Sequence, residues 1–94
     1  MRHGRRDSTH GVVRRTLRDL GCSVYDTGDV GHNFPDFVVG LLGRDYLVEV
    51  KSPKGDLSDG QAEFARSWQG TKPVVLRSAQ EAAVWVLAKH RGVS

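Results

Sequence analysis

The sequence predicts an α/β fold in which a mixed β-sheet of about four strands is flanked by α-helices. The first observation is the order of the apolar patterns, which reads helix, strand, strand, strand, helix, strand, helix. The second is the pairing that this order implies. The two strands around Gly43 are close enough in sequence to form an antiparallel hairpin, whereas the strand after the second helix requires a crossover. A hairpin combined with crossover helices gives a mixed sheet covered by helices.

The first helix is predicted to begin at Ser8 or Thr9, because hydroxyl side chains cap helix starts. Apolar residues then recur at helical spacing, and Gly21 is a natural stop after them. These apolar residues are Val12, Val13, Leu17 and Leu20. A strand is expected over residues 22–27, and the glycine-rich residues 28–33 have the composition of a loop.

Two apolar runs then predict the hairpin. The first strand covers residues 37–42 and the second covers residues 46–51, with the turn-like residues 43–45 between them. Pro35 stands just before the first run, where a proline does not have to donate a hydrogen bond inside a central strand.

A helix, a strand and a last helix complete the chain. We expect Ser58 to cap a helix that continues through Trp68. Residues 73–77 are mostly apolar, which predicts a short strand buried on both faces. Ser78, followed three residues later by Glu81, has the pattern of a capping box for the last helix. The buried side of that helix is expected to contain Ala82, Val86 and Leu87.

The composition is that of one globular domain covering residues 1–94. With 38% hydrophobic and 27% charged residues the chain is not of the disordered class, and no apolar run approaches the roughly 18 residues that span a bilayer. The basic N-terminus is not followed by an apolar signal core, so we expect no export. The lone Cys22 suits a reducing cytoplasm, and we expect it to be a small buried hydrophobe.

Positive charge is concentrated at the start of the chain. The net charge is +3, and six arginines among the first eighteen residues face only one acidic residue there, Asp7. Such a patch favours a polyanionic partner and salt-dependent binding. A solvated helix face next to a terminal segment would account for the same charges. The six residues are Arg2, Arg5, Arg6, Arg14, Arg15 and Arg18.

The most informative pattern joins Asp36 to Glu49 and Lys51. Residues i and i+2 of a strand point to the same face, so Glu49 and Lys51 project together, about 7 Å apart. The hairpin would bring Asp36 alongside them. Two carboxylates and an ammonium group would then meet at the end of an apolar sheet, an arrangement that can hold a hard divalent cation beside an electrostatic stabiliser. The backbone carbonyl of Val50 is a further oxygen donor.

A plainer interpretation is an ion pair between Glu49 and Lys51 on an exposed strand face. Two features favour the site instead. Glu49 lies in a segment apolar enough to be central, where an unpaired carboxylate is costly. The polar residues 52–55, which have loop composition, follow the strand immediately.

Pro35-Asp36, followed after twelve residues by Glu49-Val50-Lys51, resembles the signature of the PD-(D/E)XK nucleases. The surrounding sequence is similar to the small phage and prophage VRR-NUC nucleases, which are relatives of archaeal Holliday-junction resolvases. This wider similarity extends over nearly the whole chain, from about Arg6 to about Ala83, and it includes residues 31–40, residues 46–52 and Gln61 near the start of a helix.

The resemblance implies a single VRR-NUC-like nuclease domain with a restriction-endonuclease-like core, in the order αβββαβ plus a C-terminal helix. Asp36, Glu49 and the Val50 carbonyl would be ligands of Mg²⁺, for which Mn²⁺ could substitute. Lys51 would be the catalytic lysine. Gln61 would reach back to the site and steer Lys51 or a water molecule, unless it is a solvated residue of the first helical turn.

One position departs from the family pattern. Many relatives carry an acidic residue on the first helix as an additional metal ligand, and His10 stands at that place here. His10 would then be a metal-proximal or phosphate-contacting group, and its alternative is a plain surface histidine. Whether the site holds one metal ion or two is left open by this substitution.

Four basic residues become candidates for DNA binding once a nuclease is considered. Phosphate contacts fix the position of DNA without reading its sequence. The candidates are Arg5, Arg6, Arg14 and Lys54.

These features together predict a metal-dependent DNA endonuclease that recognises DNA shape, such as branches or junctions, and acts as a two-fold homodimer. The expected location is the cytoplasm, and that of a host cell if the chain is phage-encoded. Three alternatives remain: a DNA-binding module without catalysis, a nuclease subunit that acts only with a partner protein, and a small structural α/β protein.

Overall fold

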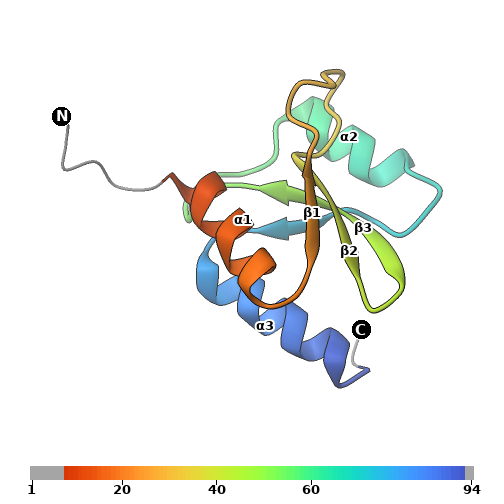
Figure 1. Ribbon diagram of the computed structural model, residues 1–94. Coiled ribbons are helices and arrows are strands. Elements are labelled where there is room, and N and C mark those ends of the chain that lie inside the picture. Colours follow the sequence, from red (N-terminus) through yellow and green to blue (C-terminus); the bar gives the residue numbers. More distant parts are fainter. Residues whose placement is uncertain (1–7, 93–94) are drawn as a thin grey trace, which may run out of the picture.

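The computed structural model describes residues 8–92 of the chain, and its seven elements follow the predicted order (Figure 1). The helices are α1 (Thr9–Asp19), α2 (Asp59–Ser67) and α3 (Ala79–His90). The strands are β1 (Ser23–Asp26), β2 (Phe37–Leu41), β3 (Arg44–Val50) and β4 (Val74–Leu76). Among these described residues, no helix combines the length and the apolar character needed to cross a membrane.

The four strands form one mixed sheet in the order β1-β2-β3-β4. The β1–β2 and β2–β3 pairs are antiparallel, and β3–β4 is parallel because α2 and its flanking loops carry the chain back across the sheet. The predicted mixed sheet is therefore confirmed, and β3, which carries Glu49, is a central strand.

The core lies between one face of the sheet and two helices. Phe37 pairs with Val48 and Val39 pairs with Tyr46, so these residues point to the same face, and all four are buried. Helices α1 and α3, at opposite ends of the described chain, pack against each other over this face (Figure 1). They contribute Val13, Leu17, Ala82 and Val86 to the core, and Cys22 is buried there as predicted.

The helix caps agree closely with the sequence. The Ser8 side chain accepts a hydrogen bond from the Gly11 backbone N–H and begins α1, and Gly21, with φ of 93°, follows its end. Ser78 caps α3 in the same way, by accepting from the Glu81 backbone N–H. The Glu81 carboxylate, however, accepts from the backbone N–H of Arg77 rather than that of Ser78, so the predicted capping box is shifted by one residue.

Helix α2 lies on the other side of the sheet from α1 and α3 (Figure 1). Glu49 pairs with Val75, and both point away from the core face towards α2. The two sides of the sheet thus differ, because a packed core covers one of them and the candidate site residues lie on the other.

Two details of the predicted sheet are wrong. The hairpin turn consists of Leu42 and Gly43, and β3 begins at Arg44, so Arg44 and Asp45 belong to a strand. Residues 73–77 do not form a strand buried on both faces, because β4 is a three-residue strand at the edge of the sheet, with only Leu76 buried. An apolar run looks the same at an edge as at the centre, since periodicity does not report which strand lies next to it.

The predicted buried side of α3 is wrong at one position. Ala82 and Val86 are buried, but Leu87 is 50% exposed. Trp85 takes its place by packing against the core, edge-on to Tyr46.

The hairpin turn generates a prediction. Leu42 and Gly43 have φ of 54° and 79°, the left-handed pair that two-residue hairpin turns require, and leucine is poorly suited to it. Leu42 is 58% exposed, so its side chain contributes little burial. We expect Leu42→Asn to raise the free energy of unfolding by about 1 kcal/mol, measured by urea denaturation. Tyr25→Asn, at an exposed strand position, is the control and should not stabilise; a destabilised Leu42→Asn variant would contradict this account.

Candidate active site

Asp36 is held at the start of β2 by a buried threonine. The Asp36 carbonyl accepts a hydrogen bond of 2.7 Å from the Thr27 backbone N–H, and the Thr27 hydroxyl donates to the Pro35 carbonyl, also at 2.7 Å. Thr27 is one of two buried polar or charged residues among those described, and the other is Glu49. No sequence pattern identifies Thr27 in advance, because a threonine at the junction of a strand and a glycine-rich loop is ordinary turn composition.

The Asp36 carboxylate bridges two elements. Its Oδ2 accepts a hydrogen bond of 2.8 Å from the Val50 backbone N–H, which fixes it beside the end of β3. Its Oδ1 lies 3.5 Å from Nε2 of His10, whose ring packs against Phe37 with 4.7 Å between the ring centroids. The predicted approach of Asp36 to the end of β3 is present, and the first helix supplies His10 to the same carboxylate.

Glu49 is buried beside Asp36, with 5% of its surface exposed. Its Oε2 accepts a hydrogen bond of 3.1 Å from Nε2 of Gln61 and lies 3.9 Å from Nζ of Lys51. Burial raises the pKa of Glu49, as do its hydrogen bond with Asp36 and the Asp36 charge, whereas Lys51 lowers it; the resulting pKa is about 8. Without a bound cation, the Glu49 carboxyl therefore carries a proton at neutral pH.

Gln61 uses both ends of its side-chain amide. Its Oε1 accepts from the Ser58 backbone N–H at 2.9 Å, and its own backbone N–H donates to the Ser58 hydroxyl at 3.2 Å, which completes a capping box at the start of α2. With Oε1 engaged in the cap, Nε2 is directed to Glu49. Either glutamate or glutamine can complete a capping box, but only the glutamine amide also supplies this N–H donor.

The oxygen atoms of the site suit a hard divalent cation. Within residues 8–92, no three His, Cys, Asp or Glu side chains gather as a metal-binding group, so the carboxylate contribution is the pair Asp36 and Glu49. Mg²⁺ is commonly held by one or two carboxylates together with substrate phosphates and water. The Val50 carbonyl faces the same edge of β3 as its N–H, which contacts Asp36. The mutual repulsion that raises the pKa of Glu49 would be relieved by a cation between the two carboxylates.

The residues predicted to contact DNA differ in how exposed they are. Lys54 is exposed in the loop that follows β3. Arg14 is half-buried, donates to Asp26 at 3.2 Å and lies over the Phe37 ring. Arg5 and Arg6 lie outside the described residues. The DNA-binding role of all four stays a prediction, as does a metal-binding role for His10.

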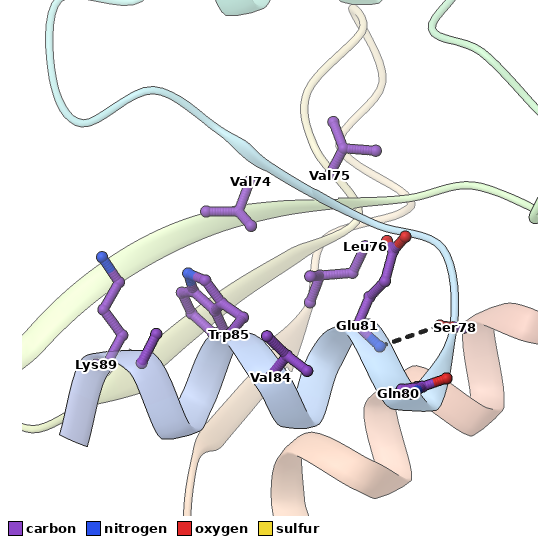
Figure 2. A pocket seen from close by; sticks show the side chains of 10 residues that line it. Val74, Val75, Leu76, Ser78, Gln80, Glu81, Val84, Trp85 and Lys89 are labelled. Carbon is purple, nitrogen blue, oxygen red and sulfur yellow. Dashed lines mark hydrogen bonds between the residues drawn. The ribbon is translucent and has the colours of Figure 1, made fainter. Parts of the chain in front are cut away.

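A second hollow in the surface is separate from this site. An apolar groove of about 600 Å³ lies between β4 and α3, with Trp85 and Val84 along one side and Val74 along the other (Figure 2). Glu81 and Lys89 stand at its two ends (Figure 2). None of the predicted site residues lines it.

Comparison with known proteins identifies the fold. A solved structure described as a VRR_NUC domain superposes with a TM-score of 0.66 and 22% sequence identity, over 86% of this chain and 97% of that chain. No protein-family model and no curated protein matches the sequence. The VRR-NUC-like α/β fold that the resemblance implied is therefore confirmed.

The raised pKa of Glu49 predicts how stability depends on pH. Because the pKa is about 8 in the folded chain and 4.5 ordinarily, unfolding releases a proton between these values. The contribution of Glu49 to stability is therefore complete below about pH 4.5 and is lost as pH rises towards 8. In EDTA, we expect wild type to lose up to about 1.4 kcal/mol per pH unit in this window relative to Glu49→Gln, measured by urea denaturation. A wild type that gains stability with pH relative to Glu49→Gln would show that Glu49 is ionised in the fold.

Proposed function

We propose that this chain is a metal-dependent DNA endonuclease, which hydrolyses phosphodiester bonds at the site formed by Asp36, Glu49, Lys51 and Gln61. The observation that carries the proposal is the buried Glu49 carboxyl, 5% exposed, set against a second carboxyl and a lysine at the end of a central strand. Burying a carboxyl group lowers the stability of the fold, so its presence here indicates a role in binding a cation and a substrate. The nuclease-type fold supports the same conclusion.

Asp36, Glu49 and the Val50 carbonyl would hold Mg²⁺, or Mn²⁺ in its place. When bound, the metal ion would polarise the phosphate and lower the pKa of a water molecule. Glu49 has to release its proton before it can act as a ligand, and Lys51 and Gln61, both next to Oε2, favour its ionised form. His10 holds the other side of the site through Asp36.

Lys51 and Gln61 act on the reacting groups. In hydrolysis, the oxygen of a water molecule forms a bond to phosphorus, the bond from phosphorus to the leaving oxygen breaks, and that oxygen takes up a proton. Negative charge grows on the phosphate oxygens in the transition state, and the Lys51 ammonium group, beside Glu49, would stabilise it. Gln61 keeps Glu49 oriented through its Nε2 and would help to position the attacking water.

DNA shape is the proposed basis of recognition. The site lies at the end of β3, beside the loop that carries Lys54, and the helices of residues 8–92 are short, with 9 to 12 residues each. Lys54 and Arg14, with Arg5 and Arg6, would contact phosphates without reading bases. Branched DNA such as a four-way junction offers distinct shape to such a protein, and we propose it as the substrate.

A homodimer would supply the two active sites that symmetric cutting of a junction needs. We propose the groove between β4 and α3 as its contact surface (Figure 2). Val84 and Leu87, exposed by 61% and 50%, lie between Glu81 and Lys89 on α3. Two copies of α3 packed antiparallel about a two-fold axis would cover these apolar residues and place Glu81 of each copy opposite Lys89 of the other, so the surface is complementary to itself.

The nuclease assay compares a labelled four-way junction with a matched linear duplex in Mg²⁺, Mn²⁺ or EDTA. We expect cutting of the junction only with a divalent metal, and a loss of at least about 100-fold in Glu49→Ala and Lys51→Ala, since each removes a group that acts in the transition state. Arg44→Ala, at an exposed position at the hairpin end of β3, is the control and should cut as wild type does.

The alternatives predict different outcomes. Equal cutting of the linear duplex would retain the nuclease and remove the preference for branches. Tight binding that is insensitive to EDTA, without cutting in any metal, would show a DNA-binding module. Cutting that appears only when a partner protein is added would show a nuclease subunit.

The dimer surface has its own test. We expect Val84→Lys to convert a dimer to a monomer in light scattering after gel filtration, because it puts a charge into the apolar contact on each copy. Val30→Lys is the matched control, since Val30 is 54% exposed in the loop between β1 and β2, outside the groove. A wild type that is monomeric at high concentration, or a dimer that Val84→Lys leaves intact, would rule out this surface.

A further inference from the structure

Three aromatic side chains on the site-bearing side of the sheet form a cluster of their own. Phe64 stacks on Trp68 with 5.1 Å between ring centroids, and Phe34 meets both rings edge-on, at 5.6 Å and 6.4 Å. Phe34, Phe64 and Trp68, called here the aromatic cluster, are not part of the hydrophobic core between the sheet and helices α1 and α3. Trp68 is 38% exposed. Because these three rings do not pack in the main core, the segments that they join have to explain their role.

Helix α2 depends on this cluster. None of its nine residues is buried, so it is not anchored by a core-facing side like those of α1 and α3. Phe64 lies in its second half and Trp68 is its C-cap, so two of the three rings belong to α2 and its end. The third ring, Phe34, comes from the loop between β1 and β2. The cluster therefore ties α2 to that loop.

The two segments that the cluster joins are the ones that carry the site. Phe34 directly precedes Pro35-Asp36, and Phe64 stands three residues, about one helical turn, after Gln61. Between α2 and the sheet, Gln61 and Phe64 line the same small space as Glu49 and Pro35. A shift of α2 relative to the loop would change the distance between Gln61 and Glu49, which now share a hydrogen bond of 3.1 Å.

A second contact fixes the start of α2 against the same loop. A Cβ atom at Gly60 would lie 2.6 Å from the amide end of the Asn33 side chain, so any other residue at position 60 would require that side chain to move. His32 and Asn33 both have left-handed backbone, with φ of 57° and 65°, a conformation that histidine and asparagine adopt more readily than most other non-glycine residues. The loop is thus shaped to receive the first turn of α2, next to Gln61.

We infer that the aromatic cluster and the Gly60–Asn33 contact are a positioning device, which holds α2 against the loop between β1 and β2 so that Gln61 Nε2 reaches Glu49 Oε2. Phe34, Phe64 and Trp68 are positioning residues that act through Gln61. The consequence for catalysis rests on the proposed nuclease function, but the effect on the Gln61–Glu49 contact does not. A displacement of about 1 Å at a reacting group can cost up to about 100-fold in rate, so a loosened α2 should lower kcat more than it raises KM.

The first experiment follows Gln61 directly and needs no enzyme activity. We expect the side-chain amide signals of Gln61 in NMR spectra to move, in Phe64→Leu, towards their positions in Glu49→Ala, where the hydrogen bond is lost. Leu20→Ala is the control for general destabilisation, because Leu20 is a partly buried core residue about 15 Å along α1 from His10. It should leave these signals in place. Unchanged Gln61 signals in Phe64→Leu would overturn the inference, even if wild type cuts no DNA.

The second experiment uses Gly60→Ala, which adds one methyl group. Alanine favours a helix over glycine by about 1 kcal/mol, so the helix itself is not weakened, but the new Cβ forces the Asn33 side chain out of its present position. We expect the same change in the Gln61 signals as in Phe64→Leu. Adding Asn33→Gly removes the clashing side chain and suits the left-handed backbone, so the double variant should recover the wild-type signals. A normal spectrum in Gly60→Ala would contradict the second contact.

The third experiment tests the link to catalysis once cutting is established. We expect Phe64→Leu to lower kcat about 10-fold with a smaller change in KM, and to have no further effect in a Gln61→Ala background. Leu20→Ala should leave kcat at the wild-type value. Losses that simply multiply in the double variant would show that Phe64 acts independently of Gln61 and would overturn the positioning role.

Discussion

The arrangement of this protein depends on one costly interaction, the burial of the Glu49 carboxyl against the Asp36 carboxyl where β2 begins and β3 ends. Burial and the neighbouring charge raise the pKa of Glu49 to about 8, so the fold tolerates the pair only with a proton or a cation between them. Neighbouring contacts serve this pair: the Val50 N–H and His10 hold Asp36, and Lys51 and Gln61 hold Glu49. Without these two carboxyl groups, the polar groups around them would have no buried partners at this otherwise apolar sheet.

The pleat of the sheet places the core residues on one face of β3 and the candidate site residues on the other. Alternate residues of β3 point to opposite faces, so Val48 and Val50 join the core under α1 and α3, whereas Glu49 and Lys51 face the other way. The backbone N–H of Val50 contributes to the site although its side chain is in the core. The packed core on one face of β3 therefore fixes the strand that carries Glu49, the buried carboxyl of the candidate site, on its other face.

Much of the fold and of the site was predictable because it rests on local rules. Caps at Ser8 and Ser58 and strand alternation at Glu49 and Lys51 are properties of neighbouring residues. The errors concern relations between distant segments. That β4 is an edge strand and that Leu87 is exposed depends on what packs beside them. Thr27 could not be identified either, since its role exists only once the chain returns at Pro35, eight residues later.

The contact between the first and the last helix has a consequence for synthesis of the chain. Helix α1 and the hairpin emerge early from the ribosome, but the apolar face that they share is covered only when α3 packs against α1 (Figure 1). Until then Val13, Leu17, Phe37 and Val39 have no complete partner surface, and the nascent chain exposes sticky apolar residues. This face of the sheet is therefore covered only after α3 has been made, and a ribosome that pauses before residue 79 would leave an apolar segment that chaperones can bind.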